Sequence, residues 1–242
     1  MQKRPGRVLT LSENRMATIA ERARLLMAEI SRLEQVHQRE PGSVALIGIS
    51  KTQPAQSVRE AWEGGVRQFG ESYLQEALPK IAELGELRIV WHFVGRIQAN
   101  KTAAIAASFD WVHGIDRLRV AQRLNDQRPV HLPPLNCCLE VNLGAEESKG
   151  GVRAEELAAL ATCVAALPQL RLRGLMTLPE ASTGLERQRV PFARLAQRFA
   201  ELRVPIPQLD TLSMGMSADM EAAIAEGATM VRIGTALFGP RA

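Results

Sequence analysis

The feature that most limits the folds open to this chain is a regular alternation of short apolar runs with longer amphipathic segments. Each run is bounded by Gly, Pro, Asn or Asp, and each is followed by a segment with apolar residues at helical spacing. The runs predict strands at 44–50, 66–69, 89–94, 111–114, 135–142, 172–177, 211–214 and 230–233. The segments between and after them predict helices at 55–63, 74–84, 99–107, 117–124, 154–167, 186–202 and 220–226.

Eight strands that alternate with helices predict an α/β protein, namely a (β/α)8 or TIM barrel. The strands are strongly apolar without polar alternation, as expected when helices or other strands cover both faces of a parallel sheet. An open, doubly wound sheet is the alternative. The chain has no glycine-rich phosphate-binding motif in its early part, and this favours the barrel.

The length of the chain and its even composition suggest one domain. A chain of 242 residues falls within the roughly 200–250 residues that a single barrel occupies. Apolar residues at helical spacing predict an additional N-terminal helix, and no shift in composition marks a linker. We therefore expect a single domain over 1–242, with the helix at about 11–36 and the barrel at about 44–242.

Composition argues against several classes of partner. The formal charge of +4 comes from Lys and Arg spread among acidic residues, so nucleic-acid binding is not expected. No apolar run approaches the ~20 residues of a membrane span, and the N-terminus lacks the apolar segment of a signal peptide, so we expect no membrane association and a cytoplasmic location. Cys137, Cys138 and Cys163 lack metal-type spacing and are expected to be reduced thiols.

In a barrel, the residues directly after each strand form the active-site face. Lys51 follows the apolar run ALIGIS and has no acidic neighbour in sequence. Apolar surroundings disfavour the charged amine and lower its pKa, and a neutral amine is the nucleophile that attacks an aldehyde. Lys51 is therefore a candidate for imine formation. The alternative is an ordinary surface lysine at the start of a loop.

Two turns have the composition of a phosphate site. The segment Ser213-Met214-Gly215-Met216-Ser217 follows the seventh strand, and Gly234-Thr235 follows the eighth. Backbone N–H groups at the start of a helix bind anions, and barrels often bind phosphate after strands seven and eight. The alternative is that Gly and Ser serve only tight turns and helix caps.

Arg232 and His92 are polar residues within apolar strands. A guanidinium inside a barrel should face a planar acceptor or a carboxylate, and the alternative is a salt bridge at the rim, for example to Glu71. His92 is either a catalytic or binding group or a core histidine with its hydrogen bonds satisfied.

These residues belong to segments that resemble the pyridoxal phosphate homeostasis protein family, single-domain relatives of the alanine racemase barrel. The resemblance covers nearly the whole chain, from Val44 to Arg241. It is carried by several long segments in the same order: ISKTQP, FGESYLQEALPKI, WHFVGRIQANK, HGIDRLR, LEVNLGAEESKGG, RLRGLMTLP and LSMGMSADMEAAIAEGATMVRIGTALFG.

The resemblance implies a cofactor and the residues that bind it. Lys51 would hold pyridoxal 5′-phosphate (PLP) as a Schiff base, and Arg232 would face the pyridine nitrogen. The residues implied around the phosphate are Ser213, Met214, Gly215, Met216, Ser217, Gly234 and Thr235. Those implied around the ring are His92, Asn142 and Met176, with Lys101 and Lys149 as further basic residues near the cofactor.

The chain departs from the family pattern at two positions. Ser72 stands where the family usually has asparagine, and Arg96 stands where it usually has proline. Ser72 offers one hydroxyl in place of an amide, and Arg96 adds a charge near the barrel mouth. Either change could alter how tightly the cofactor is held.

The resemblance favours a carrier over an enzyme. An arginine at the pyridine nitrogen leaves the ring unprotonated and a poor electron sink. Related racemases overcome this with a tyrosine from a second domain, whereas this sequence ends after the eighth strand and has Tyr73 as its single tyrosine. We therefore expect a monomeric, non-catalytic protein that buffers PLP or delivers it to apo-enzymes. The alternatives are a weak amino-acid racemase and a barrel that binds another phosphorylated aldehyde.

Overall fold

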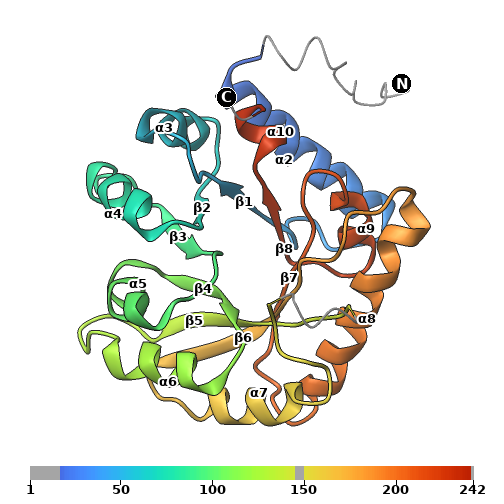
Figure 1. Ribbon diagram of the computed structural model, residues 1–242. Coiled ribbons are helices and arrows are strands. Elements are labelled where there is room, and N and C mark those ends of the chain that lie inside the picture. The colour runs from blue at the N-terminus through green and yellow to red at the C-terminus, as the bar shows by residue number, and fades with distance from the viewer. Residues whose placement is uncertain (1–16, 145–149, 241–242) are drawn as a thin grey trace.

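The computed structural model describes residues 17–144 and 150–240. Its strands form a closed parallel barrel in chain order, with β1 paired to β8 (Figure 1). The predicted (β/α)8 barrel is confirmed, and the open sheet is excluded. The strands are β1 (Ala45–Ile49), β2 (Gln68–Glu71), β3 (Val90–Phe93), β4 (Trp111–Ile115), β5 (Leu135–Glu140), β6 (Leu170–Met176), β7 (Thr211–Ser213) and β8 (Met230–Ile233).

Helices surround this ring of strands (Figure 1). They are α2 (Ile19–Val36), α3 (Ala55–Glu63), α4 (Leu74–Glu83), the 3-10 helix η1 (Ala99–Lys101), α5 (Thr102–Ser108), α6 (Leu118–Gln127), α7 (Leu157–Ala165), α8 (Leu185–Arg203), α9 (Met220–Ala225) and α10 (Thr235–Phe238).

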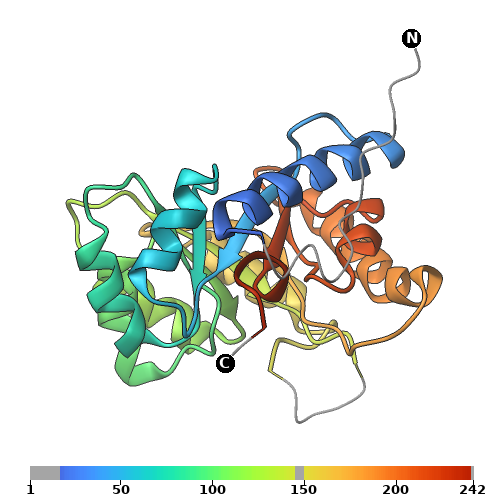
Figure 2. The ribbon, with the colours of Figure 1, turned by 90° about the horizontal axis from the view of Figure 1, so that it is seen from above.

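The additional N-terminal helix is α2. Thr18 caps it, because the Thr18 side chain accepts the N–H of Glu21 while the Glu21 carboxylate accepts the N–H of Thr18. Arg22 donates to the carbonyl of Leu237 at 2.7 Å and so links α2 to α10, which lies beside it (Figure 2). The predicted start of this helix, at 11–16, lies outside the described residues.

Some element boundaries differ from the prediction. The strand expected at 135–142 ends at Glu140, because Val141 leaves the ladder and forms an isolated bridge with Val152. The helix expected at 99–107 begins as the 3-10 helix η1. Helix α10 was not predicted, since its four residues are too few to show a helical period.

Alternate strand residues enter two different apolar layers. Inside the ring, Ile47 of β1 packs in one cluster with Trp111, Cys138, Met176 and Met230. The intervening residues, such as Val112 and Val231, join the larger layer between strands and helices. The parallel strands are therefore buried on both faces, which explains their nearly continuous apolar sequence.

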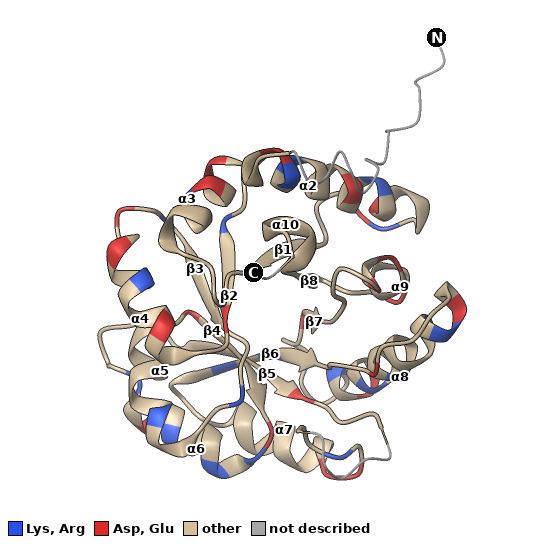
Figure 3. Cartoon of the chain, turned by 45° about the horizontal axis from the view of Figure 1, so that its top comes forward, with Lys and Arg blue, Asp and Glu red and all other residues tan. Residues whose placement is uncertain are grey.

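Charged residues lie mainly on the outer helices, with both signs interspersed (Figure 3). Among the described residues, no helix is long and apolar enough to cross a membrane. The three cysteines are free; Cys137 and Cys138 are buried, and Cys163 is exposed.

Candidate functional site

Lys51 lies at a cavity of about 260 Å³ formed by the end of β1 and the turns after β7 and β8. The side chains of β1 that face the barrel interior are those of Ala45, Ile47 and Ile49. Side chains alternate between the two sides of a strand, so Lys51, two residues after Ile49, is on this same side. The described residues that line this Lys51 cavity are Ile49, Lys51, Gln53, Met216, Ser217, Ala218, Arg232, Gly234, Thr235, Phe238 and Gly239. The structure thus brings together Lys51, both predicted phosphate turns and Arg232.

The turn after β7 depends on a glycine. Gly215 has φ of +95°, and a Cβ added there would lie 2.5 Å from the Cβ of Ala223 in α9. The next N–H, that of Met216, donates to the Asp219 carboxylate at 2.6 Å. The Met214 side chain is buried in the layer between strands and helices, so this residue can contribute only its backbone to the cavity.

The turn after β8 leads directly into α10. The carbonyl of Gly234 accepts the N–H groups of Leu237 and Phe238 at 3.0 and 2.9 Å. Thr235 is the first residue of the helix, and its side chain is available to the same cavity as that of Ser217. The two turns therefore place hydroxyl groups from different β/α units around one space.

Arg232 is buried and binds backbone carbonyls. Its guanidinium donates to the carbonyl and hydroxyl of Ser213, at 2.6 and 2.7 Å, and to the carbonyl of Thr177 at 2.9 Å. The alternative of a rim salt bridge to Glu71 is wrong, because Glu71 pairs with Lys80 instead. Burial lowers the pKa of Arg232 to about 10, so the group remains a cation at neutral pH.

A chain of hydrogen bonds crosses the barrel interior from His92 to Arg232. Nδ1 of His92 lies 2.9 Å from Nε2 of His113, and Nδ1 of His113 lies 2.8 Å from the Ser213 hydroxyl, which also accepts from Arg232. The His92 ring stacks on Trp111. His113 was not predicted as a site residue, although Trp111 and His113 stand two residues apart in β4 and so share its inner face.

Burial keeps both histidines neutral and should make the protein sensitive to acid. It lowers the pKa of His92 from 6.5 to about 3 and lowers that of His113 well below 6.5. Below pH 6.5 the unfolded chain therefore binds protons that the folded chain does not. We expect the free energy of unfolding to fall with decreasing pH, by up to about 1.4 kcal/mol per pH unit for each histidine.

Urea unfolding followed between about pH 7 and pH 5 measures this slope. His92→Gln should make the slope shallower, whereas His131→Gln, at an exposed histidine, serves as the matched control. A wild-type stability that stays constant over this range would contradict the argument.

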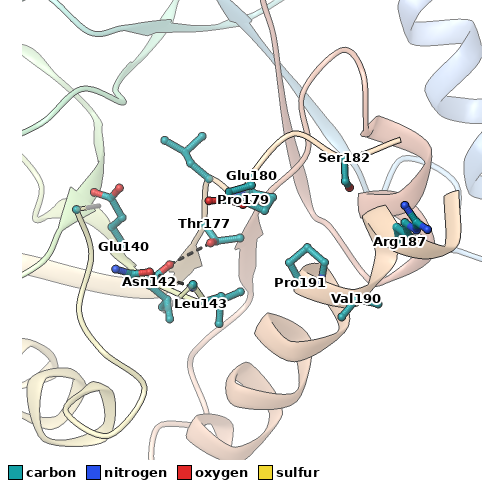
Figure 4. A pocket seen from close by; sticks show the side chains of 14 residues that line it. Glu140, Asn142, Leu143, Thr177, Pro179, Glu180, Ser182, Arg187, Val190 and Pro191 are labelled. Atoms are coloured by element: carbon teal, nitrogen blue, oxygen red, sulfur yellow. Dashed lines mark hydrogen bonds between the residues drawn. The ribbon is translucent and has the colours of Figure 1, made fainter. Parts of the chain in front are cut away.

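The Lys51 cavity is not lined by the remaining predicted site residues that the structure describes. Asn142 lines a second cavity of about 440 Å³ near the ends of β5 and β6 (Figure 4). Its Oδ1 atom accepts the N–H of Gly144, and Thr177 nearby donates to the carbonyl of Val141. Met176 is buried in the barrel interior. Lys101 belongs to η1, and Lys149 lies outside the described residues.

These groups define what the site can do. An amine can capture an aldehyde, and the hydroxyl and backbone groups of two turns can bind an anion beside a buried cation. Among the described residues, no group of three or more His, Cys, Asp or Glu side chains could hold a metal ion. The arrangement suits a small phosphorylated carbonyl compound.

Comparison with known proteins agrees with this chemistry. The family model of the alanine racemase N-terminal domain matches residues 27–242. The pyridoxal phosphate homeostasis protein of Pseudomonas aeruginosa is 56% identical over 226 residues, which cover 93% of this chain and 97% of that protein. The protein of the same name from Escherichia coli K12 is 52% identical and covers 84% of this chain and 88% of its own length.

A solved structure extends the similarity to the fold. PipY of Synechococcus elongatus PCC7942, in its structure with PLP bound, is 38% identical and matches with a TM-score of 0.78. The match covers 91% of this chain and all of PipY. The chain belongs to the pyridoxal phosphate homeostasis protein family, whose barrel is that of the alanine racemase N-terminal domain.

Proposed function

We propose that this protein binds PLP as a Schiff base on Lys51 and contributes to intracellular PLP homeostasis by buffering or delivering the cofactor. The observation that carries the proposal is that Lys51, the two turns and Arg232 meet at one cavity. The names of its relatives, and the PLP bound to PipY, support this choice of ligand.

The residues of the cavity fit the groups of PLP. PLP supplies an aldehyde that a lysine amine can capture reversibly. The hydroxyls of Ser217 and Thr235, with the N–H groups of their turns, would bind the phosphate. Arg232 is held by Ser213 and Thr177 and would direct its guanidinium toward the ring nitrogen.

The same residues favour binding of the cofactor without catalytic turnover of a substrate. The cationic Arg232 could not accept a proton from the ring nitrogen, so the ring would stay unprotonated and would withdraw electrons weakly. Among the described residues that line the Lys51 cavity, the ionisable ones are Lys51 and Arg232. Tyr73, the single tyrosine, precedes α4 and is 52% exposed. Nothing in this set supplies a second base opposite the lysine.

A weak amino-acid racemase is the second candidate, because the family model that matches is that of alanine racemase. Incubating the PLP-loaded protein with alanine in deuterium oxide separates the two functions. We expect no deuterium at the α-carbon beyond the level that free PLP gives. Exchange at enzyme-like rates, lost in Lys51→Ala, would overturn the carrier proposal.

Buffering and delivery differ in how the cofactor leaves. The loaded protein is mixed with an apo-enzyme that requires PLP, in the presence of a reagent that traps free PLP. Activation that persists despite the trap supports direct delivery, whereas complete inhibition leaves buffering through free PLP. Two results together would contradict both buffering and delivery. The loaded protein would fail to activate the apo-enzyme even without the trap, and it would not slow the capture of PLP by the trap.

A further inference from the structure

Both neighbours of Lys51 in sequence are bound by side chains of the second β/α unit. We propose that Glu71, Glu76 and Lys80 are positioning residues that fix the backbone on either side of Lys51 and so direct its amine into the cavity. This inference rests on the proposed role of Lys51 in Schiff-base formation.

Ser50, before Lys51, is held at each of its polar groups. Its N–H donates to the carbonyl of Gly70 at 3.0 Å, and its hydroxyl donates to Oε1 of Glu71 at 2.6 Å. Its carbonyl accepts from the Lys80 amine at 2.8 Å. Lys80 also contacts the same Glu71 oxygen at 2.6 Å. Ser50 and Glu71 are fully buried and Lys80 is 6% exposed, so water does not weaken this network.

Thr52, after Lys51, has a backbone conformation that needs support. Its φ is +65°, in the left-handed region that a β-branched residue rarely adopts. Its N–H donates to Oε2 of Glu76 at 3.0 Å. A strained backbone at a functional position persists only when its surroundings hold it, and Glu76 does so here together with the turn that the Gln53 N–H closes on the Ser50 carbonyl.

The two α4 side chains act as one unit. Glu76 and Lys80 are four residues apart and therefore lie on the same face of the helix. Glu76 binds the backbone N–H of Thr52, after Lys51, and Lys80 binds the backbone carbonyl of Ser50, before it. A buried ion pair is by itself weak evidence for a stabilising role, and apolar side chains could fill the same space. The specific placement of these contacts around Lys51 points to orientation of the amine.

Orientation has a measurable consequence. A fixed amine loses less conformational freedom when it bonds to the aldehyde, so covalent capture should be affected and noncovalent binding should not. PLP tests covalent capture. Pyridoxine 5′-phosphate, which carries an alcohol in place of the aldehyde, tests noncovalent binding. A defect in general structure would weaken both ligands together.

We expect Lys80→Met to slow Schiff-base formation with PLP, followed by absorbance, by roughly tenfold or more, while the affinity for pyridoxine 5′-phosphate changes less than twofold. Circular dichroism and urea unfolding check that this variant folds. Glu76→Ala, at an exposed residue where folding is not at risk, should slow the reaction by roughly threefold to tenfold. Glu76→Gln retains an oxygen that can accept the Thr52 N–H and should restore much of the rate.

Glu83→Ala is the matched control, because Glu83 is an exposed glutamate of the same helix. Equal losses for PLP and pyridoxine 5′-phosphate, or a Glu76→Ala rate equal to that of Glu83→Ala, would overturn the positioning role. If the wild type itself forms no Schiff base at Lys51, the proposed function fails instead, so the two failures are distinguishable.

Discussion

Replacing Lys51 with alanine should abolish the absorbance band that PLP develops on binding and remove the adduct that borohydride reduces. The covalent bond to the lysine is lost, and only contacts to the phosphate and the ring remain. We expect the apparent affinity for PLP to fall by roughly a hundredfold, equivalent to about 3 kcal/mol. Absorbance and equilibrium titration of the purified variant with PLP measure both effects.

Two further variants separate the covalent role of Lys51 from its charge. Lys51→Arg keeps a cation at the cavity but cannot form the Schiff base at neutral pH, so it should lose the band as alanine does. Lys101→Ala removes a lysine of η1 that does not line the Lys51 cavity and should leave the band unchanged. A band that survives in Lys51→Ala and disappears in Lys101→Ala would place the attachment elsewhere.

Gly174→Ala should strongly destabilise the barrel. A Cβ at Gly174 in β6 would lie 1.7 Å from the carbonyl oxygen of Thr211 in the paired strand β7. Both atoms belong to backbones held in a closed ring, so neither can move aside as a flexible side chain could. We expect a loss of more than about 4 kcal/mol in the free energy of unfolding, or failure to fold.

Urea unfolding measures the free energy of unfolding of Gly174→Ala and of Gly85→Ala, which serves as the control. The nearest backbone atom to a Cβ at Gly85 is at 3.4 Å, an ordinary contact distance. The control should stay within about 1 kcal/mol of the wild type. A Gly174→Ala protein as stable as this control would show that β6 and β7 are not so closely apposed.

The barrel could be predicted from the sequence because its parallel strands are buried on both faces. Each strand is therefore a short apolar run. The helices between the strands have apolar residues at helical spacing, which indicates their positions; α3, for example, lies at 55–63 as predicted. The errors occur where local pattern carries little information. Four-residue α10 shows no period, and β5 ends where the chain turns to pair Val141 with Val152.

The candidate site was predictable where a residue lies in the turn that follows its strand. Lys51, Ser217 and Thr235 could be found in this way because every parallel strand of a barrel ends on the same face. The contacts of Ser50 with Glu71 and of His113 with Ser213 join different β/α units, and no spacing in sequence indicates them. The cofactor roles of the individual residues stay predictions.

The attachment site of PLP on the wild-type protein tests the proposed role of Lys51 most directly. The protein is loaded with PLP, reduced with borohydride and digested, and the peptides are identified by mass spectrometry. We expect one phosphopyridoxyl group, on the peptide that contains Lys51. Modification confined to Lys80 or Lys101, or no stable modification at all, would contradict it.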